Sequence, residues 1–185
     1  MTCGEHRRIS RDNSEPPDIP DTREQIADPG SAYQIVSMLQ GVVQRGTGVR
    51  IRAVGKPLGG KTGTTNDSID AWFIGFSPDL AVGVFAGFDQ PSSLGRRETG
   101  SSIAVPIFRD FMAEALHDKP PIPFRIPTGI RLVSVNAKTG KRAVRGDRPV
   151  ILEAFKSGTE PQFSDGNRLP TSAGASPAGG VKGLY

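Results

Sequence analysis

Four consecutive residues, Lys61-Thr62-Gly63-Thr64, have the side-chain types that a binding site for an anionic peptide end needs. Lys61 contributes a positive charge that attracts an anion and favours deprotonated neighbours. Thr62 and Thr64 are two positions apart, so on an extended strand their hydroxyls project to the same face and can together hold a carboxylate. Gly63 has no side chain, which lets a substrate backbone lie against the strand. The four residues therefore predict a substrate-binding strand edge.

The tripeptide Lys-Thr-Gly occurs a second time, at residues 138–140. This copy follows the short apolar run 133–135 and lies among polar turn formers, so the sequence predicts a hairpin turn there. The first copy instead closes a segment, Ala53–Gly60, that reads as a strand interrupted by Pro57, and two strongly apolar runs follow it. The surroundings, and not the tripeptide itself, make the first copy the candidate site.

The composition argues against several classes of site and partner. The chain has 23 basic and 19 acidic residues, a net charge of +4, but no dense basic run of the kind that binds nucleic acid. A single cysteine, Cys3, excludes an internal disulfide framework and a cysteine-based zinc site. His6 and His117 stand far apart, without the spacing of metal ligands. We therefore expect no metal, no cofactor and no nucleic-acid partner.

No part of the chain has the pattern of a membrane-spanning or targeting segment. The apolar runs are shorter than the roughly 18 residues that a spanning helix needs. The N-terminus also lacks the apolar region of a signal peptide. Taken alone, the chain is expected to stay in the cytoplasm.

A helix is expected before the candidate site, from Ser31 to about Arg45. Ser31 and Gln34 have the spacing of a capping box, and the glycines at 46 and 48 supply the stop. Five apolar residues recur at the helical period and predict its buried face: Ile35, Met38, Leu39, Val42 and Val43.

Two apolar runs after the candidate site predict strands at Ala71–Phe76 and Leu80–Phe88. Both alternating faces of these runs are apolar, which is typical of strands covered on both sides. With the strand that bears Lys61 they make a three-stranded antiparallel meander. A polar loop, 89–100, and a second helix at about Ile103–His117 follow. The expected buried face of that helix is Ile103, Ile107, Phe108, Phe111, Met112 and Ala115.

The last third of the sequence has a different character. Residues 120–127 contain four prolines and predict a stiff, extended connector. Two short apolar runs, 130–135 and 150–155, predict a small β appendage. Residues 161–185 are rich in Gly, Ser, Ala and Pro and are expected to be disordered. The pattern as a whole predicts an α+β fold: the three-stranded meander flanked by helices, with the appendage and the tail after it.

The first copy of the tripeptide lies within a longer likeness. Lys-Thr-Gly is one of three signatures of penicillin-binding proteins and serine β-lactamases, beside S-x-x-K and S-D-N. From Asp28 to Met112 the chain resembles the transpeptidase domain of class A penicillin-binding proteins, in its C-terminal part, and a looser likeness reaches residues 158–161. The resembling blocks, in family order, are 28–29, 32–43, 45–48, 60–67, 70–80, 87–89, 98–100 and 106–108.

The resemblance implies a partial penicillin-recognising, serine β-lactamase-like fold and a function. Family members are anchored in the inner membrane, face the periplasm and build the cell wall. One domain polymerises glycan strands, and the penicillin-binding domain cross-links stem peptides by serine acyl transfer to D-alanyl-D-alanine. Thr62 and Thr64 would bind the terminal carboxylate of that peptide or of a β-lactam. The backbone N–H of Thr64 would be one of two oxyanion donors, with Lys61 acting electrostatically.

The catalytic serine and its lysine have no counterpart in this sequence. No S-x-x-K occurs in the 185 residues, and Ser134-Val135-Asn136, which spells S-x-N, follows the strand motif where the family has it before. We therefore expect the chain to be inactive by itself. Two alternatives stay open: a non-catalytic module that binds peptide ends or β-lactams, and one half of a split enzyme whose partner is the N-terminal remainder of the same enzyme.

The likeness also suggests how the chain is divided. Residues 29–118 are expected to be the C-terminal part of the transpeptidase domain, and 119–160 the connector with its appendage. The segment 1–28 reads as irregular, and 161–185 as the tail. Residues 1–26 match the family weakly, so Met1 is expected to be a truncation point or a misassigned start.

Overall fold

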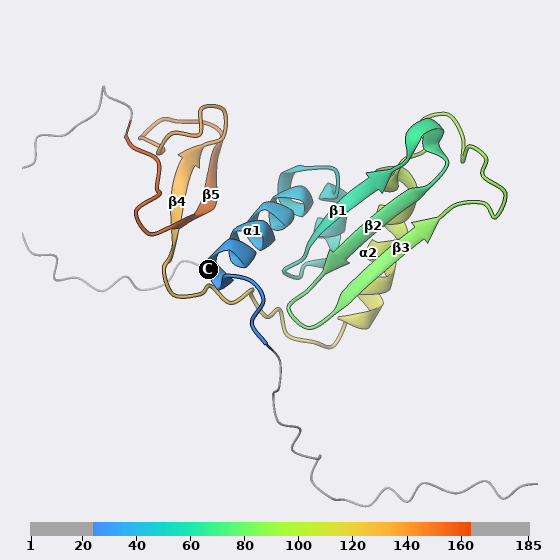
Figure 1. Cartoon of the computed structure of the whole chain (residues 1–185), viewed down its shortest axis with the longest axis horizontal. Helices are drawn as coiled ribbons and strands as arrows, with labels where there is room; N and C mark the ends of the chain where they lie inside the picture. The colour runs from blue at the N-terminus through green and yellow to red at the C-terminus, as the bar shows by residue number, and fades with distance from the viewer. Residues whose placement is uncertain (1–23, 164–185) are drawn as a thin grey trace, which may run out of the picture.

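The structure, a computed structural model, describes residues 24–163 and has an α+β fold. β1, β2 and β3 form one antiparallel sheet in that order, and β4 and β5 form a second. In Figure 1, α2 lies behind the first sheet, and α1 lies between β1 and the β4–β5 hairpin. The elements, in chain order, are α1 (Pro29–Arg45), a 3-10 helix (Val49–Val54), β1 (Gly59–Thr64), a 3-10 turn (Asn66–Ser68), β2 (Ala71–Phe76), β3 (Ala81–Ala86), a π-helical turn (Gly100–Ala104), α2 (Val105–Ala115), β4 (Ile130–Asn136) and β5 (Val150–Lys156).

The three-stranded meander predicted from the sequence is confirmed, with one strand misplaced. β2 has the predicted bounds, and β3 is shorter than predicted by a residue or two at each end. The prediction of a strand over Ala53–Gly60 was wrong, because a 3-10 helix with a buried Ile51 occupies 49–54 and Gly55 ends it at a φ of 70°. Pro57 then separates that helix from β1. The strand that bears the motif therefore begins only at Gly59, and it contains Lys-Thr-Gly-Thr as the spacing of the two threonines assumed.

The core lies on one face of this sheet, under α2 and the 3-10 helix. Phe73 of β2 packs on Phe108 of α2, with ring centroids 4.7 Å apart, and both side chains are fully buried. Phe108 and Met112 were predicted to be buried and are, but Ile107 and Phe111 are about half exposed. The buried side of this helix is a narrower stripe than the apolar pattern predicted. This stripe consists of Ala104, Val105, Phe108, Met112 and Leu116.

The opposite face of the sheet has no cover among residues 24–163. Trp72, Ile74 and Phe85 are exposed by 41%, 58% and 53%, and the rings of Trp72 and Phe85 lie 4.6 Å apart. The apolar pattern typical of strands covered on both sides is therefore matched by cover on one face only within residues 24–163. An exposed aromatic and aliphatic patch of this kind promotes association or aggregation.

α1 begins two residues earlier than the capping-box spacing predicted. Its N-cap is Asp28, whose carboxylate accepts a 2.7 Å hydrogen bond from the backbone N–H of Ser31, and Pro29 stands at the first helical position. Gln34 does not complete a capping box, because its side chain donates to the carbonyl of Ala154, 3.0 Å away. Of the predicted buried face of α1, Val43 is buried, but Ile35 and Met38 are more than half exposed.

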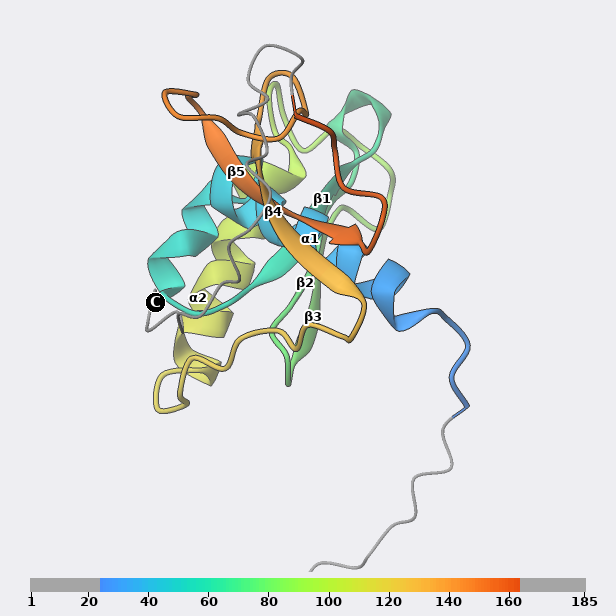
Figure 2. The same ribbon diagram turned by 90° about the vertical axis from the view of Figure 1, so that its left-hand side faces the viewer.

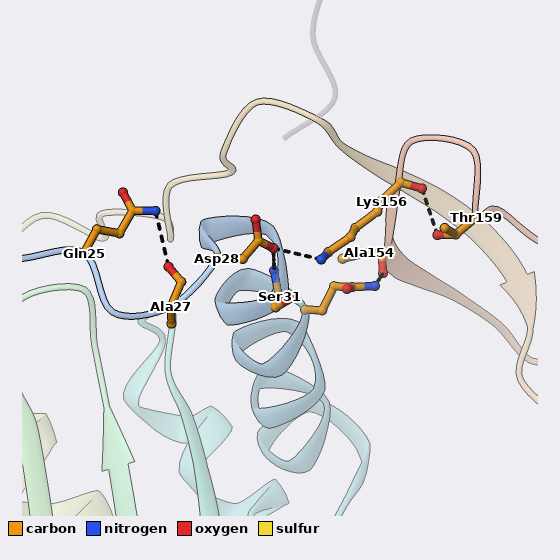
Figure 3. Close-up of polar contacts among 8 residues, drawn as sticks. Gln25, Ala27, Asp28, Ser31, Ala154, Lys156 and Thr159 are labelled. Carbon is orange, nitrogen blue, oxygen red and sulfur yellow. Dashed lines mark hydrogen bonds and ion pairs between the residues drawn. The ribbon is translucent and has the colours of Figure 1, made fainter.

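The β4–β5 hairpin, predicted as a small appendage, is docked on α1 (Figures 1 and 2). Figure 3 shows the contacts at the start of the helix, where Lys156 of β5 lies 2.8 Å from the carboxylate of Asp28. The hydrogen bonds from Lys156 and from Ser31 lower the pKa of Asp28 to about 2. Near the other end of α1, Arg45 pairs with Glu153. Together with the hydrogen bond from Gln34 to the Ala154 carbonyl, these contacts make three polar links between β5 and the α1 segment.

The Pro-rich connector has no regular secondary structure between residues 119 and 127, as predicted. Phe124 packs edge-on against Phe76 of β2, with ring centroids 5.5 Å apart. None of the helices in the described range is long and apolar enough to cross a membrane. The predicted tail, beyond residue 163, and most of the predicted N-terminal segment lie outside the described residues.

Candidate active site

The Lys-Thr-Gly-Thr motif lies on β1, which is an edge strand of the first sheet. One edge of β1 pairs with β2, and no strand of residues 24–163 pairs with the other. Lys61 and Thr64 are exposed, and Thr62 and Gly63 are half-buried. The motif is thus reachable from solvent, as a substrate-binding edge requires.

The backbone of β1 presents its polar groups to the open edge at the two threonines. The N–H of Thr65 donates to the carbonyl of Asp70, 3.1 Å away, and these residues continue the β1–β2 register. In an antiparallel pair, successive residues turn their N–H and C=O groups alternately toward the partner strand and away from it. Thr64 and Thr62 therefore turn theirs away from β2. In agreement, the side chain of Lys61 donates to the Thr62 carbonyl at 2.9 Å.

The two threonine side chains lie on the same face of the sheet, as their spacing predicted. They share the face of Phe73, because Thr62 is paired with that residue across the strands. Each hydroxyl already has one partner. The Thr62 and Thr47 hydroxyl oxygens are 3.0 Å apart, and the Gly100 backbone N–H donates to the Thr64 hydroxyl at 3.0 Å.

Thr47 and Gly100 were not among the predicted site residues. Both belong to blocks that carried the family resemblance, residues 45–48 and 98–100, and that was the only signal available for them. Spacing could not reveal them, because Thr47 follows α1 and Gly100 opens the π-helical turn before α2. Only the folded chain brings these segments to β1.

Gly63 and Lys61 project to the other face of the sheet. A Cβ on Gly63 would lie 3.2 Å from the Cβ of Trp72, its partner across the strands, so the strand itself favours glycine there. Lys61 is paired with Ile74 in the register. Within residues 24–163, the Lys61 ammonium makes no ion pair.

Three acidic residues near the motif, Asp67, Asp70 and Glu98, have structural positions in turns and loops. Asp67 occupies a left-handed turn position with a φ of 58°, and Asp70 continues the pairing of β1 with β2. Glu98 accepts a 2.7 Å hydrogen bond from the Ser102 hydroxyl. The described residues contain no group of three or more His, Cys, Asp or Glu side chains placed to hold a metal ion.

The second Lys-Thr-Gly copy forms a tight turn after β4, as predicted. The side-chain oxygen of Asn136 accepts from the backbone N–H groups of Lys138 and Thr139, at 2.9 and 3.2 Å. Gly140 follows with a φ of 69°. Ser134, of the S-x-N sequence, lies in β4 and therefore in the second sheet.

A hollow of about 890 Å³ lies away from the motif, at the start of α1. Residues at the beginning of α1, in the connector and at the end of β5 line it, and none of residues 61–64 does. The candidate site is therefore an open strand edge in the described chain, with no enclosing wall opposite it.

Comparison with known proteins places the chain in a family. The family model for the penicillin-binding protein transpeptidase domain matches residues 14–113, more than half of the sequence. The chain belongs to the penicillin-binding protein transpeptidase family. The match includes the whole of β1, with the Lys-Thr-Gly-Thr motif, and both segments that contact its threonines.

Among similar proteins are the penicillin-binding proteins 1A of two bacteria. The Rickettsia bellii protein is 50% identical over 131 residues, covering 71% of this chain and 16% of the relative. The Pseudomonas aeruginosa protein is 42% identical over 165 residues, covering 84% and 20%. The crystal structure of penicillin-binding protein 1A from Haemophilus influenzae matches with a TM-score of 0.61 and 36% identity, over 70% of this chain and 20% of that one. The chain thus spans a fifth or less of the length of these relatives.

Proposed function

We propose that β1 forms the substrate-binding wall of a D,D-transpeptidase site. Thr62 and Thr64 would hold the terminal carboxylate of a peptidoglycan stem peptide ending in D-alanyl-D-alanine, or that of a β-lactam. Lys61 would attract this carboxylate electrostatically, and the Thr64 backbone N–H would be one donor to the oxyanion. The proposal extends to this chain the cross-linking activity expected from the family likeness.

The observation that carries the proposal is the orientation of the Thr64 backbone. An oxyanion donor must be aimed at the reacting carbonyl before the reaction starts, and losing one costs roughly 100- to 1,000-fold in rate. An N–H bonded within the sheet would be useless for this purpose. The alternation of the β1–β2 ladder turns the Thr64 N–H to the unpaired edge, on the strand that also bears Lys61.

We further propose that this wall does not form an acyl-enzyme without additional polypeptide. Covalent catalysis needs a nucleophile with an activating base, and the sequence has no S-x-x-K to provide them. Within residues 24–163, the face of Trp72, Ile74 and Phe85 is exposed and the outer edge of β3 pairs with no strand. Both features fit a domain completed by other segments, and the N-terminal remainder of such an enzyme is the expected partner. The purified chain should show no mass increase after incubation with penicillin. An acylated species would contradict this part of the proposal.

Binding by the wall is tested by titrating the chain with an N-acyl-D-alanyl-D-alanine dipeptide while recording amide NMR shifts. One strand edge with no opposing wall should bind weakly, with a Kd of about 1 mM or above. Shifts should centre on residues 62–64 and shrink strongly in Lys61→Ala. Lys138→Ala is the matched control, because it removes the same charge from the other copy of the tripeptide.

The C-terminal carboxamide of the same dipeptide provides a second control. It lacks the charge that Lys61 and the threonine hydroxyls are proposed to recognise, so it should produce no saturable shifts at residues 62–64. Equal responses to the acid and the amide, or equal effects of Lys61→Ala and Lys138→Ala, would overturn the assignment of this edge to carboxylate binding.

A further inference from the structure

Two segments outside the motif meet its threonine side chains. Thr47, just after α1, shares a hydrogen bond with Thr62 through the two hydroxyls, 3.0 Å apart. Gly100, at the start of the π-helical turn, donates its backbone N–H to the Thr64 hydroxyl at 3.0 Å. Ser101, the next residue, donates its hydroxyl to the Thr47 carbonyl at 2.7 Å. These contacts link the segments to each other as well as to β1.

The contact from Gly100 decides how the Thr64 hydroxyl can bind a ligand. A hydroxyl has one hydrogen to donate and two lone pairs that accept. A backbone N–H can only donate, so one lone pair of Thr64 is occupied and its hydrogen stays free. Among the described residues, no acceptor takes that hydrogen. Thr64 is therefore set as a donor toward a group placed beside the edge.

The hydroxyls of Thr47 and Thr62 can form a chain of two hydrogen bonds that ends on a ligand. Only one hydrogen is used between them, and either oxygen can be the donor. A carboxylate can only accept, so beside Thr62 it selects the arrangement in which Thr62 donates to it and Thr47 donates to Thr62. Hydrogen bonds aligned in this way polarise one another, and those to a charged acceptor are the stronger ones. Thr47 would then assist the ligand without touching it.

The Gly100 contact depends on residue 100 being a glycine. A Cβ there would lie 2.4 Å from the Trp72 carbonyl oxygen and 2.6 Å from that of Gly63, and neither can rotate away. The turn is held from its other side by a capping box between Thr99 and Ser102. Without a side chain, the backbone of Gly100 lies directly against β1 and β2, and its N–H reaches the Thr64 hydroxyl.

We propose that Thr47, Gly100 and Ser101 are positioning residues that set the two threonine hydroxyls of β1 as donors to a carboxylate. Thr47 orients Thr62, Ser101 fixes the backbone of Thr47, and Gly100 orients Thr64. The inference rests on the proposed function for its ligand, a peptide or β-lactam carboxylate. The geometry of the hydroxyls does not depend on that ligand and is measured separately.

The experiment compares Thr47→Val with Thr47→Ser in the full chain. Valine keeps the shape and removes the hydroxyl, and serine restores it. The Hα–Hβ coupling of Thr62 reports its χ1 rotamer without any ligand, and a titration with N-acyl-D-alanyl-D-alanine reports Kd. Thr139→Val is the matched control, since Thr139 lies in the other copy of the tripeptide and its hydroxyl accepts a bond from the Lys141 N–H.

In Thr47→Val the Thr62 side chain should populate several χ1 rotamers, so its Hα–Hβ coupling should move to an averaged value. The Kd for the dipeptide should rise about threefold to tenfold, the range for losing one hydrogen bond. Thr47→Ser should restore both, and Ser101→Ala should have an intermediate effect. An unchanged Thr62 coupling in Thr47→Val and in Ser101→Ala would overturn the inference, whatever the dipeptide does. If the coupling responds but the wild-type chain binds no dipeptide, the positioning role is supported and the proposed function fails.

Discussion

The two copies of Lys-Thr-Gly show how little a tripeptide determines. At 61–63 it is part of an edge strand, with the glycine facing Trp72 and the lysine exposed without an ion pair among the described residues. At 138–140 it is a turn closed by the side chain of Asn136, with the glycine in a left-handed conformation. The same three residues follow the structure that their neighbours impose.

The two copies also differ in the contacts that stabilise them. The turn is stabilised by contacts within a few residues, from Asn136 to Gly140 and Lys141. The strand copy depends on segments that are distant in the chain, since Thr47 is 15 residues from Thr62 and Gly100 is 36 from Thr64. A site built from distant segments can be adjusted by changes outside the motif. The turn has no such dependence.

The largest effect is expected for Gly100→Ala. The added methyl group would overlap two backbone carbonyl oxygens, so we expect the free energy of unfolding to fall by about 2–3 kcal/mol. Amide shifts should change at residues 62–64 and stay constant at 138–140. Urea denaturation and NMR measure these two effects.

Gly83→Ala in β3 is the control for Gly100→Ala. The nearest atom to its added Cβ is Ile74 Cγ1, 3.9 Å away, an ordinary contact. This variant should unfold at the same urea concentration as the wild type or a slightly higher one, because alanine costs less conformational entropy than glycine in a strand. Similar losses of stability in the two variants would contradict the close approach inferred at residue 100.

A smaller effect is expected from replacing the two motif glycines. Gly140→Ala should cost about 1–2 kcal/mol because its φ of 69° strains an L-residue although the site has space. Gly140→Asn should cost less, since asparagine tolerates the left-handed region. At Gly63 the constraint is Trp72 Cβ, 3.2 Å from an added Cβ, so asparagine should be no better than alanine. Thermal unfolding of the four variants tests the contrast, which fails if asparagine is equally favourable at both positions.

Local patterns in the sequence predicted the parts of the fold that local forces decide. The bounds of β2, the turn at 138–140 and the two strands of the hairpin follow from apolar runs and turn formers. The N-cap of α1 was misassigned because Ser31 and Asp28 both have capping side chains. Pro29, directly after Asp28, favours the earlier start that the structure has. The family likeness was needed to attach a function to β1.

What the sequence could not predict depends on contacts between distant segments. The buried stripe of α2 is narrower than its apolar pattern, so Ile107 and Phe111 were placed in the core and are about half exposed. In the same way, Thr47 and Gly100 reach β1 through the fold alone. The roles of Lys61, Thr62 and Thr64 as site residues stay predictions, although their placement on an open edge is consistent with them.

The smallest effect on stability is expected from breaking the contact between Asp28, at the start of α1, and Lys156 of the hairpin. This hairpin carries the second copy of the tripeptide. The folded-state pKa of Asp28 is about 2, below its ordinary value of 3.8, chiefly because Lys156 donates a hydrogen bond to the carboxylate. A lowered folded-state pKa stabilises the fold above the unfolded pKa, and this contribution is lost as the pH falls from about 4 to about 2. The effect should be small because both groups are exposed to solvent and salt. Amide shifts of Ala154 and Lys156 should follow this titration, while those of residues 61–64 should not.

Asp28→Asn should remove only the part of the acid response at Lys156 that comes from Asp28, because Glu153 and Glu160 of the hairpin region keep their carboxylates. Asp110→Asn provides the comparison. Asp110 also has a lowered pKa, through the hydrogen bond from its neighbour Arg109, but both residues lie on α2 and join no second element. Its replacement should leave the hairpin shifts and their pH dependence unchanged. If acid shifted residues 61–64 and the hairpin together, the two copies of the tripeptide would be coupled through α1, and the independence of the turn from the strand site would be wrong. If acid shifts only the hairpin, the geometry of the site edge does not depend on the link between Asp28 and Lys156.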